Sequence, residues 1–196
     1  MKLAKQLDYL GTETAFAVSA AAAAWGAKGN KIYPFHLGDI NLPTPAYIVE
    51  AMQKAIGDGF TGYCPGPGVP ELRDAIARDV GTKRGLQYNS DNVSIQPGGK
   101  PVIAKFIATI MNSGDEVLAM DDLYGGSRRL FENVRKRTSN LKFNFGDLSD
   151  SSNIEKLLTN KTKMIWVETP TNPTLKIVDL EYISKVAKKH NIITVA

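Results

Sequence analysis

Short apolar runs alternate with amphipathic segments along the second half of the chain. The apolar runs have the length and β-branched content of buried strands, and the segments between them repeat apolar residues with the spacing of a helix. The expected strands are residues 93–96, 116–120, 141–145, 163–168 and 192–196, and the expected helices are 101–111, 127–136, 153–158 and 180–190. Such alternation is typical of a mainly parallel sheet with helices on both faces and right-handed crossovers. The pattern therefore predicts a three-layer α/β fold.

The first 91 residues carry mostly helical spacing. Helices are expected at 12–27, 45–56 and 71–84, with a strand-like run at 31–37 and a Gly- and Pro-rich loop at 61–69. The expected caps are Thr44 at one helix N-terminus and a Ser152–Glu155 capping box at another. Residues 1–91 are thus predicted to be an N-terminal helical segment, and no linker divides residues 1–196 into separate domains.

The composition is that of a globular chain: 43% of its 196 residues are hydrophobic and 22% are charged. No apolar run is long enough to span a bilayer, and the alanine tract at 20–24 lacks the flanks of a signal peptide, so no membrane partner is expected. The net charge of +4 raises the possibility of nucleic-acid binding. The basic residues at 128–137, however, are spaced as the solvated face of an amphipathic helix, and no zinc-finger or RNA-binding motif accompanies them. Nucleic acid is therefore not an expected partner.

Cys64 is the one cysteine of the chain. A lone cysteine excludes an internal disulfide and fits a reducing compartment, so a cytoplasmic location is expected. It is interpreted as an ordinary structural thiol because no histidine-rich patch accompanies it, and no set of metal ligands is assigned.

A glycine turn links an expected strand to an expected helix at Val93–Pro101. Pro97-Gly98-Gly99 makes the turn, and Pro101 suits the first turn of a helix. The backbone N–H groups of such a turn and the positive end of the helix can hold a phosphate. An ordinary connection between a strand and a helix explains the same residues equally well.

Unusual residues follow three of the expected strands. They are Gln96-Pro97-Gly98-Gly99-Lys100, Met120-Asp121-Asp122-Leu123-Tyr124-Gly125-Gly126 and Glu168-Thr169-Pro170-Thr171-Asn172-Pro173. In open α/β sheets, ligands bind outside the carboxyl ends of the strands. Gly98, Tyr124 and Asn172 are therefore expected to converge at one edge of the sheet. The expected core includes Val93, Ile95, Ile103, Ile107, Val117, Leu118, Ile165 and Val167.

Two sets of motifs resemble pyridoxal 5'-phosphate (PLP)-dependent transferases of fold type I. Residues 8–118 resemble class I/II aminotransferases, on Leu10–Phe16, Leu37-Gly38 with Pro43-Thr44-Pro45, Gly62-Tyr63 through Arg73, Pro97–Lys100 and Asn112–Val117. Residues 119–196 resemble the cystathionine γ-synthases and γ-lyases, on Asp121–Ser127 and Trp166–Thr174. The two branches meet near Leu118–Met120. Leu175 departs from the aminotransferase pattern, which more often has a glycine there.

The resemblance implies PLP as the cofactor and assigns roles to seven residues. The phosphate would lie on Gly98, Gly99 and Lys100. Tyr124 would stack on the pyridine ring, and Asn172 would donate to the phenolate oxygen of the cofactor. Tyr63 would reach the phosphate of a neighbouring subunit, and Gly38 would line the substrate pocket. Lys100 is equally well a solvent lysine, and without the resemblance Asn172 is only a turn residue. The alternative for Tyr124 is an ordinary loop tyrosine, although its flanking glycines favour stacking. The role of Tyr63 implies a homodimer or homotetramer with sites at the subunit interface.

The family's Schiff-base lysine, its pyridinium-binding Asp and its small C-terminal domain have no match in the sequence. The Asp and the lysine are expected beyond the strand at 192–196. The chain is therefore expected to be a partial large domain with no catalytic residue of its own, and inactive in isolation.

Three functions are open at this point. The first is an aminotransferase that exchanges an amino group between an amino acid and a 2-oxo acid, and the second is a carbon–sulfur lyase or synthase of the transsulfuration type. The third is a non-catalytic α/β binding module that kept the fold without the chemistry.

Overall fold

The computed structural model describes residues 5, 14–36, 38 and 41–196. The chain divides into two compact units, Met1–Cys64 and Pro65–Ala196, and each is described by itself. Part of the aminotransferase-like motif at Leu10–Phe16, the expected helix start at Thr12, and Leu37 lie outside the described residues.

The first unit contains two of the three expected N-terminal helices, α1 (Thr14–Gly26) and α2 (Ala46–Gly57). The strand-like run was predicted wrongly, because residues 31–36 form no strand. Pro34 has no N–H to donate, and the N–H of Phe35 donates to the Tyr33 carbonyl at 2.9 Å in a tight turn. The Thr44 cap is also wrong: Pro45 precedes α2, and no side chain caps the helix.

The second unit begins with α3 (Pro70–Arg84), which starts at a proline and ends at Gly85 in the left-handed conformation, φ +65°. A short 3-10 helix, η2 (Ser90–Asn92), follows, and then an extended segment at 93–96. The expected strand at 93–96 is not formed. The Val93 N–H donates to the Ser90 carbonyl at 3.1 Å and the Ile95 N–H to the Pro67 carbonyl at 2.8 Å, and no described strand pairs with this segment. Helix α4 (Gly99–Ile110) comes next and begins two residues before Pro101.

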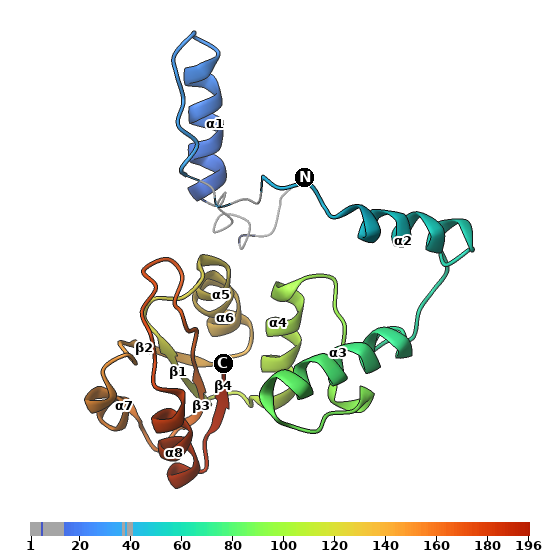
Figure 1. Ribbon diagram of the computed structural model, residues 1–196. Helices are drawn as coiled ribbons and strands as arrows, with labels where there is room; N and C mark the ends of the chain where they lie inside the picture. The colour runs from blue at the N-terminus through green and yellow to red at the C-terminus, as the bar shows by residue number, and fades with distance from the viewer. Residues whose placement is uncertain (1–4, 6–13, 37, 39–40) are drawn as a thin grey trace. The chain divides into compact units, whose positions relative to one another are not determined.

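Four of the five expected strands form the sheet, and all of them are parallel, as predicted (Figure 1). They are β1 (Glu116–Met120), β2 (Lys142–Gly146), β3 (Thr162–Trp166) and β4 (Ile193–Val195), in the order β2-β1-β3-β4. Helices α7 (Ser151–Leu157) and α8 (Leu180–His190) lie on one side, and α4 and α5 (Gly125–Arg129) lie on the other. After α5 the helix continues as the π-helical segment η3 (Leu130–Arg135) and α6 (Lys136–Thr138).

The cap of α7 also differs from the prediction. The carboxylate of Asp150, not the hydroxyl of Ser152, caps α7, and it accepts from the Ser152 N–H at 2.9 Å. Asp and Ser are both good N-caps, and Asp150 takes the position because α7 begins at Ser151.

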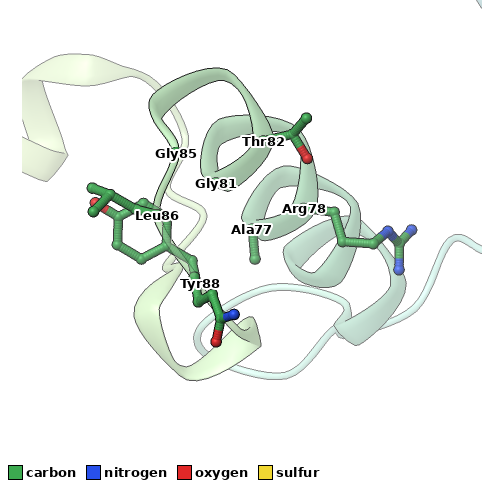
Figure 2. A pocket seen from close by; sticks show the side chains of 8 residues that line it. Ala77, Arg78, Gly81, Thr82, Gly85, Leu86 and Tyr88 are labelled. Carbon is green, nitrogen blue, oxygen red and sulfur yellow. The ribbon is translucent and has the colours of Figure 1, made fainter.

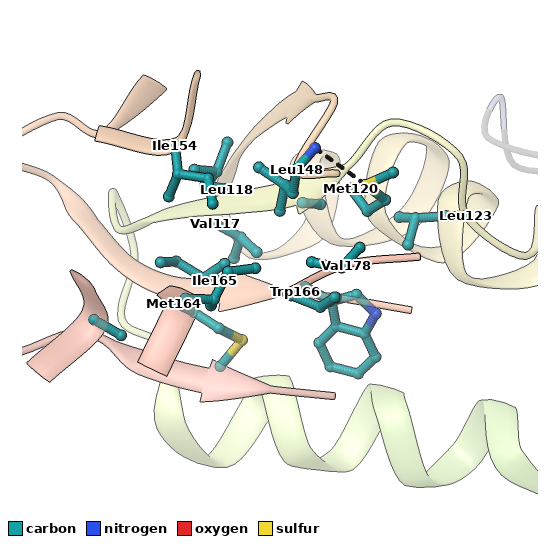
Figure 3. Packing of buried hydrophobic residues seen from close by; sticks show 14 of the residues in the cluster. Val117, Leu118, Met120, Leu123, Leu148, Ile154, Met164, Ile165, Trp166 and Val178 are labelled. Atoms are coloured by element: carbon teal, nitrogen blue, oxygen red, sulfur yellow. Dashed lines mark hydrogen bonds between the residues drawn. The ribbon is translucent and has the colours of Figure 1, made fainter. Parts of the chain in front are cut away.

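Strand β1 is buried along its whole length, and its side chains alternate between two apolar layers. On one face Leu118 and Met120 pack with Leu148 and Ile154 (Figure 3). On the other face the ring of Phe131 stacks on Phe143 at 4.8 Å and meets Trp166 edge-on at 5.4 Å. Of the expected core, Ile107, Val117, Leu118, Ile165 and Val167 are buried and Ile103 is partly buried. Val93 and Ile95 are only half-buried, because their segment lies outside the sheet.

An ion-pair network holds the loop that follows β3. The Lys176 ammonium donates to Asp147 at 2.9 Å and to Asp121 at 3.2 Å, and these carboxylates follow β2 and β1. Asp147 also accepts from the N–H and hydroxyl of Ser149. These hydrogen bonds, first from Ser149 and then from Lys176, lower the pKa of Asp147 to about 2. Three strand ends are thereby joined at one edge of the sheet.

We predict that Phe131→Ala removes the aromatic packing between η3 and the sheet. Truncation of a buried aromatic side chain costs about 3–5 kcal/mol of unfolding free energy. Urea unfolding followed by circular dichroism measures it, and Ile177→Ala, on a side chain that is 67% exposed, is the control, with a change within about 0.5 kcal/mol. A loss below about 1 kcal/mol for Phe131→Ala would contradict this packing.

Asp147→Asn is expected to destabilise the second unit in a pH-dependent way. Because the folded-state pKa lies near 2, below the ordinary value of 3.8, the charged carboxylate stabilises the fold above about pH 4 and loses this effect as the pH falls towards 2. The difference in stability between wild type and Asp147→Asn should therefore be full at pH 6 and shrink between pH 4 and 2. A control, Glu181→Gln, alters an exposed i,i+4 pair and should change little. A difference that stays constant over this range would refute the role of Asp147.

Candidate cofactor site

The glycine turn and helix α4 provide an anion-binding geometry. Gly98 has φ +101°, a conformation that glycine adopts without steric cost, and α4 starts at the next residue. The Gly98 N–H donates to the Gln96 carbonyl at 2.8 Å, which closes the turn. The first N–H groups of a helix lack intrahelical acceptors and lie at its positive end. In this arrangement the phosphate donors are those of the first turn of α4, and Gly98 shapes the turn that presents them.

Lys100 and Tyr124 lie side by side over Gly126. The Lys100 Nζ atom is 5.8 Å from the centroid of the Tyr124 ring. A Cβ atom at Gly126 would come within 2.4 Å of Tyr124 Cε1 and within 2.7 Å of Lys100 Cε. The close packing of these side chains thus requires a glycine, although φ at Gly126 is ordinary. Because Tyr124 remains 38% exposed, its ring is accessible to a planar ligand.

Glu168 fixes the backbone of the Tyr124 loop from the end of β3. Its Oε2 accepts from the Tyr124 N–H at 2.8 Å, and its Oε1 accepts from the buried Ser127 hydroxyl at 3.1 Å. The loops after β1 and β3 are therefore tied together. Sequence reasoning gave Glu168 no role, and the available signal was a carboxylate directly at the carboxyl end of a buried strand.

Asp122 ties the same two loops at a second point. One carboxylate oxygen, Oδ2, accepts from the Thr171 hydroxyl at 2.5 Å, from the Thr174 N–H at 3.0 Å and from the Thr174 hydroxyl. These hydrogen bonds, with Thr171 the largest cause, lower the pKa of Asp122 below its ordinary value. This contact was also missed from the sequence.

Asn172 is exposed on the loop that Asp122 holds. Within the part of the chain that the structure describes, its side-chain amide makes no hydrogen bond, so its donors are available to a ligand. Leu175, three residues on, has φ +59°. This left-handed backbone explains why a glycine is the more frequent residue at that point of the aminotransferase pattern.

The structure places the loops that carry Tyr124 and Asn172 at the carboxyl edge of the sheet and brings Lys100 into contact with Tyr124. The turn that carries Asn172 is bound through Thr171 and Thr174 to Asp122, which lies two residues before Tyr124. Gly38 and Tyr63 belong to the first unit, whose position relative to the second is not defined. Their predicted roles, and those of the other site residues, stay predictions.

Two hollows lie elsewhere on the second unit. One, of about 590 Å³, is formed by the end of α3 and the segment after it, where Ala77, Leu86 and Tyr88 line it and Arg78 extends outward (Figure 2). The other, of about 360 Å³, is an apolar groove between α4 and residues 94–96. None of the predicted cofactor residues lines either hollow. Among the described residues, no helix is long and apolar enough to cross a membrane, and no group of three or more His, Cys, Asp or Glu side chains could hold a metal.

The residues at this edge fit PLP by their chemistry. The cofactor carries a phosphate, a planar ring and a phenolate oxygen. The N-terminus of α4 supplies a site for the phosphate. The accessible Tyr124 ring supplies a surface for stacking, and the exposed Asn172 amide supplies a donor to the phenolate oxygen.

Comparisons with known proteins agree with this fit. A cystathionine β-lyase of Coxiella burnetii is 56% identical over 90 residues, which cover 46% of this chain and 23% of that protein. A probable aspartate aminotransferase of Methanocaldococcus jannaschii is 30% identical over 163 residues, 82% of this chain and 44% of that protein. The chain thus spans less than half the length of these curated relatives.

Solved structures show the same fold. An aspartate aminotransferase from Thermus thermophilus with maleate superimposes with a TM-score of 0.85 and 24% identity, over 99% of this chain and 52% of that chain. The sequence model of the Cys/Met metabolism PLP-dependent enzymes matches residues 85–196, more than half of the chain. PLP is the cofactor of this family, and the chain belongs to the Cys/Met metabolism PLP-dependent enzymes.

Proposed function

We propose that the second unit forms the phosphate- and ring-binding part of a PLP site, in a protein that transfers an amino group between an amino acid and a 2-oxo acid. The main support for the cofactor site is the packing of Lys100 and Tyr124 over Gly126, beside the N-terminus of α4. The match to a probable aspartate aminotransferase over 82% of the chain supports amino transfer.

Each residue would have a definite task in this site. The first turn of α4 binds the phosphate, Tyr124 stacks on the ring, and Asn172 donates to the phenolate oxygen. Bound PLP supplies an electron sink for bonds at the α-carbon of an amino acid. Glu168 holds the Tyr124 backbone through its N–H, and so keeps the ring at the level of the helix N-terminus.

A carbon–sulfur lyase or synthase is the second candidate. The 56% identity to a cystathionine β-lyase over 90 residues favours it. Both reactions use the same cofactor-binding groups, so the geometry of this edge is common to the two.

The proposal extends to the whole assembly. Residues 1–196 form part of a large domain in which 1–91 are the N-terminal helical segment, Gly38 lines the substrate pocket, and exposed Tyr63 reaches the phosphate of a neighbouring subunit. The protein would then be a cytoplasmic homodimer or homotetramer. The aminotransferase-like motifs around Gly38 and Tyr63 support this arrangement.

Gly126→Ala is expected to weaken PLP binding without unfolding the chain. The new methyl group displaces the Tyr124 ring and the Lys100 side chain, whereas Gly125→Ala, in the same short helix, meets only Arg129 at 3.7 Å. Loss of stacking should raise the Kd for PLP by about three- to tenfold in Gly126→Ala and leave it unchanged in Gly125→Ala. Equilibrium dialysis with PLP measures both. Equal affinities in the two variants would contradict the placement of the ring on Tyr124.

Product analysis separates the candidate reactions. Because residues 1–196 alone are expected to be inactive, the test uses the whole protein in which they are proposed to form part of the large domain. This protein, supplied with PLP, is incubated with an amino acid and a 2-oxo acid, and in parallel with cystathionine. Formation of a new amino acid without thiol release supports the aminotransferase, and thiol release supports the lyase. PLP binding by the whole protein with neither product would contradict both reactions and leave a non-catalytic binding module.

A further inference from the structure

Two adjacent carboxylates after β1 contact different parts of the loop that follows β3. Asp121 pairs with Lys176, at the far end of that loop. Asp122 contacts Thr171 and Thr174, which stand on either side of Asn172. Both residues are acidic and both contact the loop after β3, but only Asp122 contacts the turn that carries the Asn172 amide.

The three hydrogen bonds to Asp122 Oδ2 fix the turn at both ends. The Thr171 hydroxyl also accepts from the Lys176 N–H at 2.8 Å, and the Thr171 N–H donates to the Lys176 carbonyl at 3.0 Å. Thr171 therefore connects the Asp122 carboxylate to Lys176, at the other end of the loop. Thr171 is buried, and Asn172 beside it is exposed. The position of the Asn172 amide is therefore set by its neighbours, since its own side chain makes no hydrogen bond within the described residues.

Asp122 also lies two residues before Tyr124. A movement of the turn relative to Asp122 would change the separation between the Asn172 donor and the Tyr124 ring. In bound PLP, the Asn172 amide would donate to the phenolate oxygen and the Tyr124 ring would stack on the pyridine ring. The separation of these two groups therefore decides whether one ligand contacts both.

We propose that Asp122 is a positioning residue that holds the Asn172 amide at the phenolate oxygen of bound PLP. This inference rests on the proposed cofactor site. It assigns Asp122 an effect that passes entirely through Asn172.

A double-mutant cycle tests this dependence. The Kd for PLP is measured by equilibrium dialysis for the full chain and for Asp122→Ala, Asn172→Ala and the double variant. Loss of one hydrogen bond to a charged oxygen predicts a rise in Kd of about tenfold for each single variant. Because both changes remove the same contact, the double variant should bind no more weakly than Asn172→Ala.

The matched control is Asp121→Asn. It removes a carboxylate from the adjacent position while Asp147 still pairs with Lys176, so the Kd should stay within about twofold of wild type. A spectroscopic readout accompanies the affinities: the pKa of the bound phenol, from absorbance, should rise in both Asn172→Ala and Asp122→Ala. Circular dichroism checks that each variant is folded.

The outcomes are distinct. Coupled losses in the cycle, with the same rise of the phenol pKa, support the inference. Additive losses, or an Asp122→Ala variant that binds like wild type, overturn it while leaving the cofactor site intact. Failure of the wild-type chain to bind PLP at millimolar concentration overturns the proposed function, and this inference with it.

Discussion

Strand β1 is buried on both faces, and this burial determines where the other strands and the loops of the second unit lie. All five of its residues are buried, and it pairs in parallel with β2 on one side and β3 on the other. Parallel neighbours must all end at the same edge, so the segments after β1, β2 and β3 emerge together. The aspartates, the glutamate and the lysine found there are brought close by the pairing of the strands, although they are separated by tens of residues in the sequence.

Hydrogen bonds and ion pairs between polar side chains then hold the loops at this edge of the sheet. Glu168 accepts from the backbone of Tyr124, Asp122 accepts from Thr171 and Thr174, and Lys176 joins Asp121 to Asp147. Each contact links two strand ends, and together they leave the Tyr124 ring and the Asn172 amide accessible. Carboxylates bind the backbone on one part of this edge, and the Tyr124 and Asn172 side chains are exposed on another.

The sequence predicted this architecture well where local pattern decides it. Strand β1 and helix α8 have the predicted bounds, because an uninterrupted apolar run and a strong helical spacing each specify one structure. The prediction failed where the local structure depends on a partner elsewhere in the chain. Residues 93–96 have a strand-like pattern, but no described strand pairs with them. Glu168 and Asp122 were missed for the same reason, since their partners lie 41 to 52 residues away in sequence. The site residues Lys100, Tyr124 and Asn172 were proposed from family resemblance, because spacing alone did not distinguish them from ordinary loop residues.

In the proposed site, one PLP molecule contacts the N-terminus of α4, the Tyr124 loop and the Asn172 loop together. Backbone amide NMR of the isotopically labelled chain, titrated with PLP, tests it directly. The signals of Gly99, Tyr124 and Asn172 should shift with one common Kd, while those of the hollow around Ala77 and Tyr88 should stay unchanged. Shifts confined to that hollow, or different Kd values for the three loops, would contradict it.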